Sequence, residues 1–249
     1  MRILLTNDDG IMAEGIYALA KELEKDYEVT IVAPETQKSA QSHAITLSKP
    51  LVVKEVELEG LESKAYSISG TPADCVRAGM EILSESPIDL VLSGINLGLN
   101  AGMDILYSGT VSAAIEANIH KIPSIAVSAE WIDGNINFDV AAKYAKMILE
   151  SSKDKLKKAN IVLNINTPYK SEKEILGIKV CKIGGPVYDY YLTEYNEEGE
   201  KTLSLQGRKD IEMIEDTDRY YLNKGYVTVT PLHYDLTNFN LLEEVKDWI

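Results

Sequence analysis

The chain has 249 residues, of which 45% are hydrophobic and 26% are charged. This length and composition are typical of one or two folded domains and exclude wholesale disorder. The net charge of −14 disfavours nucleic-acid polymers and anionic membrane surfaces as partners. Because the sequence has only four arginines, any phosphate chemistry would depend on backbone N–H groups, hydroxyls and a bound cation.

Cellular location is also constrained by the sequence. Cys75 and Cys181 are too few for a disulfide framework or a zinc cluster. No apolar stretch approaches the roughly 18 residues of a membrane span. The first apolar run is short and meets acidic residues at Asp8, which is atypical of a signal peptide. We therefore expect a cytoplasmic protein without a membrane partner.

Strands and helices alternate over the first two thirds of the chain. Apolar runs predict buried strands at residues 2–6, 29–33, 89–93, 124–128 and 161–164. Helical spacing predicts helices near residues 16–23, 73–83, 110–120 and 139–151. This order predicts an α/β fold with a mostly parallel sheet and helices on both faces.

The last third has a different pattern. It predicts antiparallel strands at 178–183, 188–195 and 201–205, a turn at 196–199, a strand at 226–232 and a terminal helix at 238–249. The tyrosine-rich hairpin either grips a second subunit or folds back on its own domain. We expect a single α/β domain over residues 1–249, with 178–249 as an oligomerisation or extension region.

Polar clusters follow several of the predicted strands, where ligands bind in open α/β sheets. The first is Asn7-Asp8-Asp9-Gly10. Adjacent carboxylates repel each other unless a cation lies between them, and a hard divalent cation prefers oxygen ligands. Gly10 permits a sharp turn after the pair. The alternative interpretation is a turn closed by an Asx hydrogen bond or a helix N-cap.

Two further clusters offer neutral oxygen ligands. Ser39 lies in the polar loop 38–43, where a hydroxyl could complete a cation shell; the alternative is a solvated loop. Asn96 and Asn100 lie in the glycine-rich segment 93–102, where amide oxygens could bind Mg²⁺ or Mn²⁺ without adding charge. The alternative there is a flexible surface loop.

The fourth cluster opens a helix. Ser108, Gly109 and Thr110 combine two hydroxyls with the free N–H groups of a helix N-terminus, which is typical of an anion site. The alternative is an ordinary N-cap. A similar segment at 70–74 favours capping, because Pro72 occupies the first helical position.

A cation beside a phosphate-sized anion site favours metal-assisted hydrolysis of phosphate esters. The sequence has neither a Gly-x-Gly-x-x-Gly after its first strand nor the Gly-Lys-Ser/Thr of a P-loop. A haloacid-dehalogenase-type phosphatase requires Asp-x-Asp after the first strand, and the spacing of Asp8 and Asp9 differs. The alternative to an enzyme is a non-catalytic protein that binds a nucleotide or a divalent cation.

An ordered set of motifs runs over nearly the whole chain: Asn7-Asp8-Asp9-Gly10-Ile11, Val32-Ala33-Pro34, Gly70-Thr71-Pro72-Ala73-Asp74-Cys75-Val76, Ser93-Gly94-Ile95-Asn96 with Gly98 and Asn100, Tyr107-Ser108-Gly109-Thr110-Val111, Gly225-Tyr226-Val227, Thr230-Pro231-Leu232 and Asp235-Leu236-Thr237. In this order the motifs resemble those of the stationary-phase survival protein SurE family. The resemblance implies a Rossmann-like core and a metal-dependent phosphatase of nucleoside 5′- and 3′-monophosphates. Some members also attack short polyphosphates.

The resemblance also implies a ligand set and an assembly. One divalent cation per subunit, Mg²⁺ or Mn²⁺, would be held by Asp8, Asp9, Ser39 and Asn96. Ser42 is the alternative to Ser39, because many members have a glycine within this loop. A homodimer or homotetramer with exchanged C-terminal segments is expected. Where family members carry an arginine-rich stretch, this chain has residues 181–186 without arginine, so nucleotide preference and assembly geometry are open.

We assign the following roles. Asp8 attacks phosphorus or positions the attacking water, and both versions stay open. Ser108, Thr110 and the N–H groups near Gly109 hold phosphate oxygens, with Asn100 as a further donor.

The three histidines are expected to have different roles. His233 follows a strand end and would protonate the leaving alkoxide, the alternative being a structural histidine. His43 is expected to order the loop of Ser39, and His120 to interact with a helix dipole.

Overall fold

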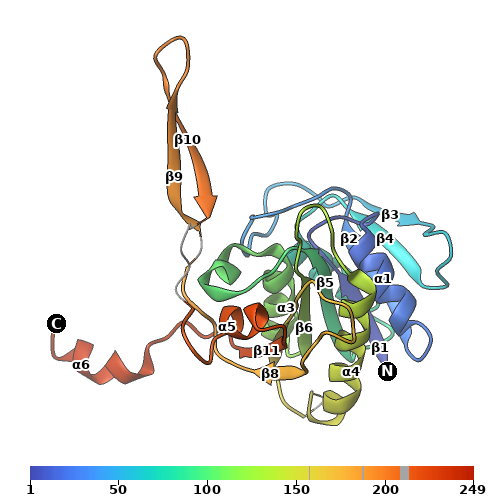
Figure 1. The fold of residues 1–249 in the computed structure, drawn as a ribbon. Helices are drawn as coiled ribbons and strands as arrows, with labels where there is room; N and C mark the ends of the chain where they lie inside the picture. The colour runs from blue at the N-terminus through green and yellow to red at the C-terminus, as the bar shows by residue number, and fades with distance from the viewer. Residues whose placement is uncertain (157, 187, 208–212) are drawn as a thin grey trace.

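The computed structural model describes residues 1–156, 158–186, 188–207 and 213–249 (Figure 1). Within these ranges a nine-stranded sheet forms the centre of the molecule. In spatial order its strands are β3 (Val53–Val56), β4 (Lys64–Ile68), β2 (Glu28–Pro34), β1 (Arg2–Thr6), β5 (Leu90–Leu97), β6 (Ser124–Ala129), β7 (Val162–Thr167), β11 (Val227–Leu232) and β8 (Ile178–Val180). All pairs from β4 to β7 are parallel, which confirms the predicted α/β class.

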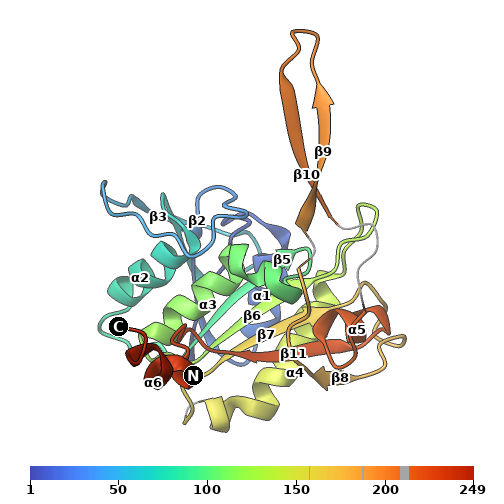
Figure 2. The same cartoon turned by 90° about the vertical axis from the view of Figure 1, so that its left-hand side faces the viewer.

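Two pairs of helices cover the two faces of the sheet. The helices α1 (Glu14–Leu23) and α4 (Phe138–Leu156) pack together on one face, and α2 (Pro72–Ile82) and α3 (Gly109–Ile119) pack on the other. Figure 2 looks towards the α2 and α3 side. Leu5, Ile31 and Leu92 belong to the core beneath α1 and α4, whereas Leu4 and Val32 belong to the core beneath α2. Burial on both faces explains why the strands are almost continuously apolar.

The order of the strands determines where a ligand can enter. β1 lies between β2 and β5, and its partners Ile31 and Ser93 lie beside Leu5 and Thr6 near its carboxyl end. The chain moves from β1 to β2 on one side and returns to β5 on the other side. Such a reversal opens a crevice beyond the carboxyl ends of the strands. The segments after β1, β2 and β5 therefore converge at one edge of the sheet.

The hairpin predicted in the last third of the chain is confirmed. β9 (Tyr188–Tyr195) and β10 (Lys201–Gly207) form an antiparallel hairpin that projects from the body in both views (Figures 1 and 2). It is the second sheet of the described chain. The helix α5 (Asp218–Asn223) and the strands β3 and β4 were not predicted.

One prediction for this region was wrong. The segment 178–183 was predicted to be an antiparallel strand, but its strand covers only Ile178–Val180 and pairs in parallel with β11. An alternating pattern indicates a strand without specifying the strand with which it pairs, and here that partner is β11. The predicted terminal helix is confirmed but is shorter than 238–249: a 3-10 turn at Phe239–Leu241 leads into α6 (Leu242–Lys246). It has no side-chain N-cap and no buried residue, so little stabilises further turns.

Among the described residues, no helix has both the length and the apolar character needed to cross a membrane.

Candidate active site

A cavity of about 620 Å³ lies at the carboxyl edge of β1 and β5. It is lined by Asp8, Ser39, Ala40, Asn96, Leu97, Gly98, Leu99, Asn100, Asp104, Tyr107, Ser108, Tyr191 and Leu205. Five of the residues predicted from sequence are therefore brought to one cavity: Asp8, Ser39, Asn96, Asn100 and Ser108. Tyr191 and Leu205 come from the hairpin, which sequence reasoning did not connect with the site.

The turn after β1 places the two acids. Asn7 closes it: its side-chain Nδ2 donates to Gly10 O at 2.9 Å, and its Oδ1 accepts from Gly10 N at 3.2 Å. Gly10 has φ of +102°, a conformation that favours glycine. The Asx turn considered from sequence thus exists, but it is made by Asn7 and leaves the carboxylates of Asp8 and Asp9 for other contacts.

Asp8 lies against the N-terminus of α3. It is only 3% exposed, and its Oδ1 accepts a hydrogen bond from Thr110 Oγ1. A Cβ at Gly109 would lie 2.8 Å from Asp8 Cβ, so glycine is required for this approach. Burial raises the pKa of Asp8 to about 6, and the charge of Asp9 adds to the increase, although the Thr110 hydrogen bond opposes it. Ionised Asp8 is therefore a buried charge for which a cation would be the natural counter-ion.

Asp9 connects the other predicted ligands. Its Oδ2 accepts from Leu97 N at 2.9 Å, next to Asn96, and its Oδ1 accepts from Gln37 Nε2 at 3.4 Å. Gln37 Nε2 also donates to Ser39 Oγ at 3.0 Å. Burial raises the pKa of Asp9 despite these hydrogen bonds. Gln37 was missed from sequence, although its place beside Ser39 in the loop after β2 could have suggested it.

These residues fit a hard divalent cation. Asn96 Nδ2 donates to Gly98 O at 2.8 Å, which leaves its side-chain oxygen as the atom suited to a cation. Two adjacent carboxylates with an amide oxygen and a hydroxyl form an all-oxygen donor set, which suits Mg²⁺ or Mn²⁺ with water completing the shell. Within the described ranges, no group of three or more His, Cys, Asp or Glu residues is arranged to hold a metal. A cation held by Asp8 and Asp9 would therefore take its other protein ligands from neutral oxygens.

Asn100 is fixed by a buried polar network. Asn166 accepts from Asn100 N at 2.8 Å and donates to Asn100 O at 2.9 Å, and Asn164 Nδ2 donates to the same carbonyl at 2.8 Å. The side chain of Asn100 donates to Ser128 Oγ at 2.8 Å. Asn164, Asn166 and Ser128 are fully buried, and sequence reasoning missed all three. Asparagines in an apolar strand were the available signal.

The predicted anion site has two kinds of contact. Ser108 Oγ accepts from Val111 N at 3.1 Å, so the N-cap interpretation is correct for this residue, while Ser108 still lines the cavity. Thr110 uses its hydroxyl on Asp8. At the related segment 70–74, Thr71 and Asp74 form the predicted cap, with both halves of a capping box present.

Asp9, Gly109 and Thr110 adjoin Asp8 but are not part of this cavity lining, and three further predicted residues lie away from it. His233 and His43 line a different cavity of about 840 Å³ beside α3 and β11. His43 Nε2 lies 2.7 Å from Glu116 Oε2, a partner that sequence reasoning missed. Ser42, the alternative to Ser39, donates its backbone N–H to Tyr107 O at 3.1 Å. The histidine predicted as the proton donor is thus not brought to the cavity of Asp8.

The segment 181–186, which departs from the family pattern, supports the site through its backbone. Asp218 is fully buried, and it accepts from Gly184 N at 2.9 Å and from Gly102 N at 2.8 Å. Arg219 Nη2 donates to Ala101 O at 2.7 Å. The loop 101–104 is therefore held from α5 by a carboxylate and an arginine.

We predict that Asp8→Asn stabilises the metal-free protein while abolishing any phosphatase activity. At pH 7.5 the buried carboxylate is ionised, and a pKa of about 6 against the usual 3.8 of an aspartate corresponds to a cost of roughly 1–3 kcal/mol in the free energy of unfolding. Urea unfolding in the presence of EDTA measures the difference in the free energy of unfolding between Asp8→Asn and the wild type. The advantage of the variant should shrink as the pH falls from 6 towards 4, because Asp8 then binds a proton in the folded wild type. An unstable variant at pH 7.5 would contradict this account.

Comparisons with known proteins agree with this geometry. The family model described as "Survival protein SurE" matches residues 3–189. The chain is 51% identical over 248 residues to "5′-nucleotidase SurE" of Clostridium tetani, covering 100% of both chains. It is 55% identical to the protein of that name from Clostridium botulinum strain Kyoto, covering 99% of this chain and 98% of the relative.

A solved structure extends the agreement to the fold. The crystal structure of the SurE protein from Aquifex aeolicus superposes with a TM-score of 0.87 at 38% identity, covering 100% of this chain and 99% of that one. The motifs, the fold and the relatives agree over the full length of the chain. The chain belongs to the SurE family.

Proposed function

We propose that the protein is a divalent-cation-dependent 5′-nucleotidase that also hydrolyses nucleoside 3′-monophosphates and short polyphosphates. The observation that carries the proposal is the position of Asp8, buried against the N-terminus of α3 and adjacent to Asp9. A cation at such a place faces the N–H groups that a helix presents to an anion. The names of the relatives support a nucleotide as substrate.

On the cation side, Asp8, Asp9, Ser39 and Asn96 would hold Mg²⁺ or Mn²⁺. The ion supplies Lewis-acid stabilisation of phosphoryl charge and makes water a better nucleophile. Asp9 keeps its orientation through Leu97 N and Gln37, and Gln37 holds Ser39 in the same arrangement. These hydrogen bonds preorganise the ligands, so little reorganisation is needed on binding.

On the phosphate side, the first N–H groups of α3 lack partners within the helix and are suited to phosphate oxygens. Ser108 lines the cavity, and its Oγ accepts from Val111 N, so that bond leaves the hydroxyl proton to donate to a phosphate oxygen. Asn164 and Asn166 hold the backbone of Asn100, and its side-chain Nδ2 donates to Ser128 Oγ, so Asn100 is a fixed polar residue in the lining of the cavity. The opposite wall, with Tyr107, Tyr191 and Leu205, suits a nucleoside.

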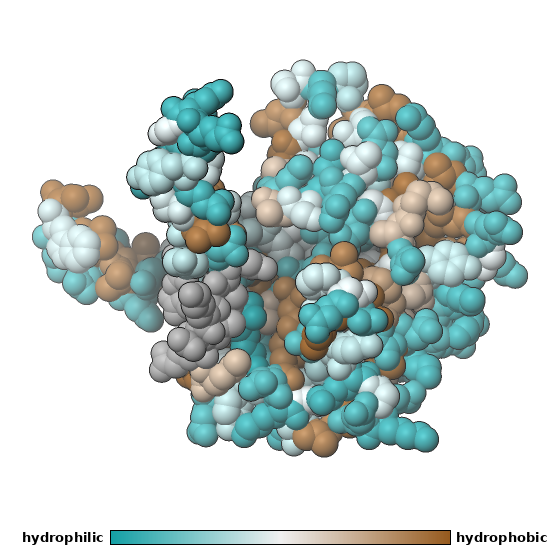
Figure 3. Space-filling view, turned by 45° about the horizontal axis from the view of Figure 1, so that its top comes forward, coloured by the Kyte–Doolittle hydropathy of each residue, from teal (hydrophilic) through white to brown (hydrophobic). Residues whose placement is uncertain are grey.

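The C-terminal segment supports the proposed assembly, a homodimer or homotetramer with exchanged C-terminal segments, for which residues 178–249 would be the oligomerisation region. Figure 3 shows the end of this region, around α6, as an arm with hydrophobic residues on its surface. Within 236–249 the large exposed hydrophobic residues are Leu236, Phe239, Leu241, Leu242, Val245, Trp248 and Ile249. Such a cluster of exposed apolar side chains is typical of an interaction site. A second copy of the chain would bury it.

The function is tested by release of inorganic phosphate from AMP with Mn²⁺. We expect turnover that EDTA abolishes and that Mn²⁺ restores, and Asp8→Asn should reduce it by roughly a thousandfold or more. Rapid quench separates the two roles of Asp8: a trapped aspartyl phosphate indicates direct attack, and its absence indicates an activated water. Tight AMP binding without phosphate release would instead identify a non-catalytic binding protein.

Ser39 and Ser42 offer a matched pair for the ligand assignment. We expect Ser39→Ala to raise the half-saturating Mn²⁺ concentration roughly tenfold, because a ligand atom is lost. Ser42→Ala should leave this concentration unchanged, since Ser42 contacts Tyr107 through its backbone N–H. Activity titrations over Mn²⁺ measure both variants. The reverse result would transfer the ligand role to Ser42.

The assembly is tested by deleting residues 236–249. Light scattering after gel filtration should give a dimer or tetramer for the full chain and a smaller species for the truncated one, because the exposed apolar surface is removed. A control change at the hairpin turn, Glu197→Ala, should leave the full-chain mass unchanged. A full chain that is monomeric at every concentration would contradict the proposal.

A further inference from the structure

The loop that carries Ser39 has little regular structure of its own. It runs from residue 35 to residue 52, between β2 and β3, without a helix or a strand. Ala40 has φ of +55° and Ser42 has φ of +53°, left-handed conformations that are unfavourable for residues with a Cβ. Contacts with the rest of the fold must therefore hold this part of the loop in place.

Two backbone hydrogen bonds join the loop to the site. Lys38 N donates to Asp8 O at 2.7 Å, and Ser42 N donates to Tyr107 O at 3.1 Å. The next residue, His43, provides a side-chain anchor, since its Nε2 lies 2.7 Å from Glu116 Oε2. Further along, Thr46 bonds to Asp74 of α2. Gln37 bonds to Asp9 on the N-terminal side of Ser39, and His43 is the side-chain anchor that follows Ser39 most closely in sequence.

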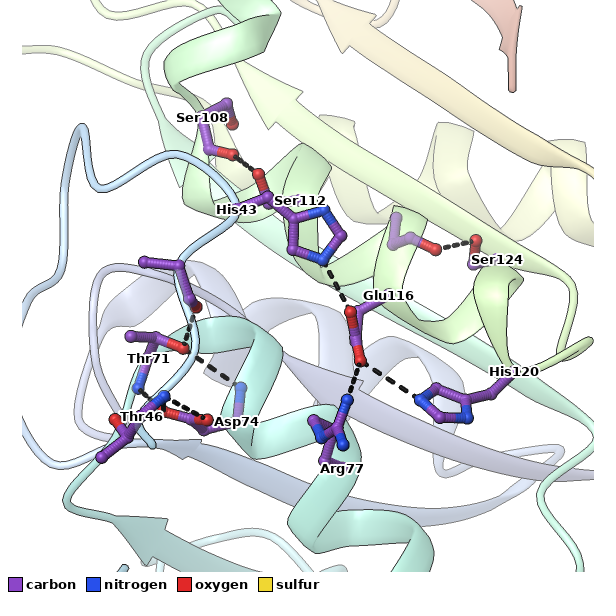
Figure 4. A network of polar contacts seen from close by, with 12 residues as sticks. His43, Thr46, Thr71, Asp74, Arg77, Ser108, Ser112, Glu116, His120 and Ser124 are labelled. Atoms are coloured by element: carbon purple, nitrogen blue, oxygen red, sulfur yellow. Dashed lines mark hydrogen bonds and ion pairs between the residues drawn. The ribbon is translucent and has the colours of Figure 1, made fainter. Parts of the chain in front are cut away.

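Glu116 is a buried carboxylate with several cationic or polar neighbours. Its side chain is 5% exposed, and Figure 4 shows His43, Arg77 and His120 converging on it from different segments. Arg77 Nη1 lies 2.9 Å and His120 Nε2 lies 3.2 Å from Oε1. Burial alone would raise the pKa of Glu116, but the hydrogen bonds from His43 and Arg77 outweigh it and lower the pKa to about 2.

The guanidinium of Arg77 decides between two interpretations of this cluster. Two histidines and a carboxylate are also the donor types of a metal site. A fixed positive charge 2.9 Å from the carboxylate opposes a cation there, and the geometry is that of an ion-pair network. Glu116 thus serves to hold its neighbours, with Oε1 taken by Arg77 and His120 and Oε2 left for His43.

The position of Glu116 on α3 links this network to the reaction. The same helix begins at Gly109 and Thr110, which contact Asp8, and Glu116 follows six residues later, about 9 Å along the helix axis. α3 therefore contacts the acid at the end of β1 at its N-terminus and the loop of Ser39 near its centre. A single rigid element sets the distance between the two groups of proposed cation ligands.

We propose that Glu116 is a positioning residue that, through His43, holds the loop of Ser39 in register with Asp8. The proposal rests on the proposed function for the role of Ser39, but the anchoring itself is independent of that role. Loss of the anchor loosens the loop and weakens cation binding, while chemistry at saturating cation is nearly retained. His120 provides a matched control because it contacts the same carboxylate from the C-cap position of α3, whereas His43 contacts it from the loop.

Hydrogen exchange tests the anchoring without using activity. The amides of Lys38 and Ser42 are the reporters, because both are hydrogen-bonded to the site. In His43→Ala we expect both to exchange about tenfold faster, the effect of losing one net hydrogen bond to a charged group. His120→Ala should stay within about twofold of wild type, and His43→Gln, whose amide can donate to Glu116, should largely restore protection. Thermal unfolding of each variant verifies the fold.

Mn²⁺ binding tests whether loss of the anchor weakens the proposed cation site. Calorimetric titration with Mn²⁺ should give a Kd about tenfold weaker in His43→Ala, with kcat at saturating Mn²⁺ within about threefold of wild type. Unchanged exchange in His43→Ala, or an equal change in His120→Ala, would overturn the proposal. A wild type that neither binds Mn²⁺ nor releases phosphate would overturn the proposed function instead, and the exchange data would still decide whether Glu116 anchors the loop.

Discussion

The burial of Asp8 against the N-terminus of α3 is the constraint on which the rest of the site depends. A carboxylate that is 3% exposed needs compensation, and here it receives a hydroxyl, a helix N-terminus and, in the proposed function, a cation. Gly109 permits the approach, because any Cβ would meet Asp8. The helix is in turn packed on the sheet and on α2. The fold thus keeps the ionised carboxylate of Asp8 buried, where the loss of its hydration destabilises the protein. This is expected of a site that binds and polarises a ligand.

Much of this arrangement could be predicted from sequence, because position after a buried strand determines which edge of the sheet a residue reaches. Asp8 and Ser39 follow β1 and β2, Asn96 lies near the end of β5, and the structure brings all three to one cavity. The reversal of strand order around β1 explains this convergence. Contacts between side chains that are far apart in the sequence could not be predicted in this way. Asn166 lies on β7, and nothing local indicates that it fixes Asn100.

Other differences have equally specific causes. Periodicity predicted a strand near 178–183 but could not choose between the hairpin and β11 as its partner. His233 follows a strand end as predicted, but β11 is antiparallel to β7, so that end lies beside a different cavity. Glu116 could have been found, since it is the one charged residue in a helix of small and apolar side chains. A lone charge in such a helix indicates buried partners.

Diffraction at the manganese absorption edge from crystals soaked in Mn²⁺ tests the central claim most directly. The account predicts one anomalous peak per subunit, within ligand distance of Asp8 and Asp9 and facing the first turn of α3. A neutral oxygen from Asn96 or Ser39 should complete the protein ligands. A peak elsewhere in the molecule, or no peak between the two acids at saturating Mn²⁺, would contradict the account.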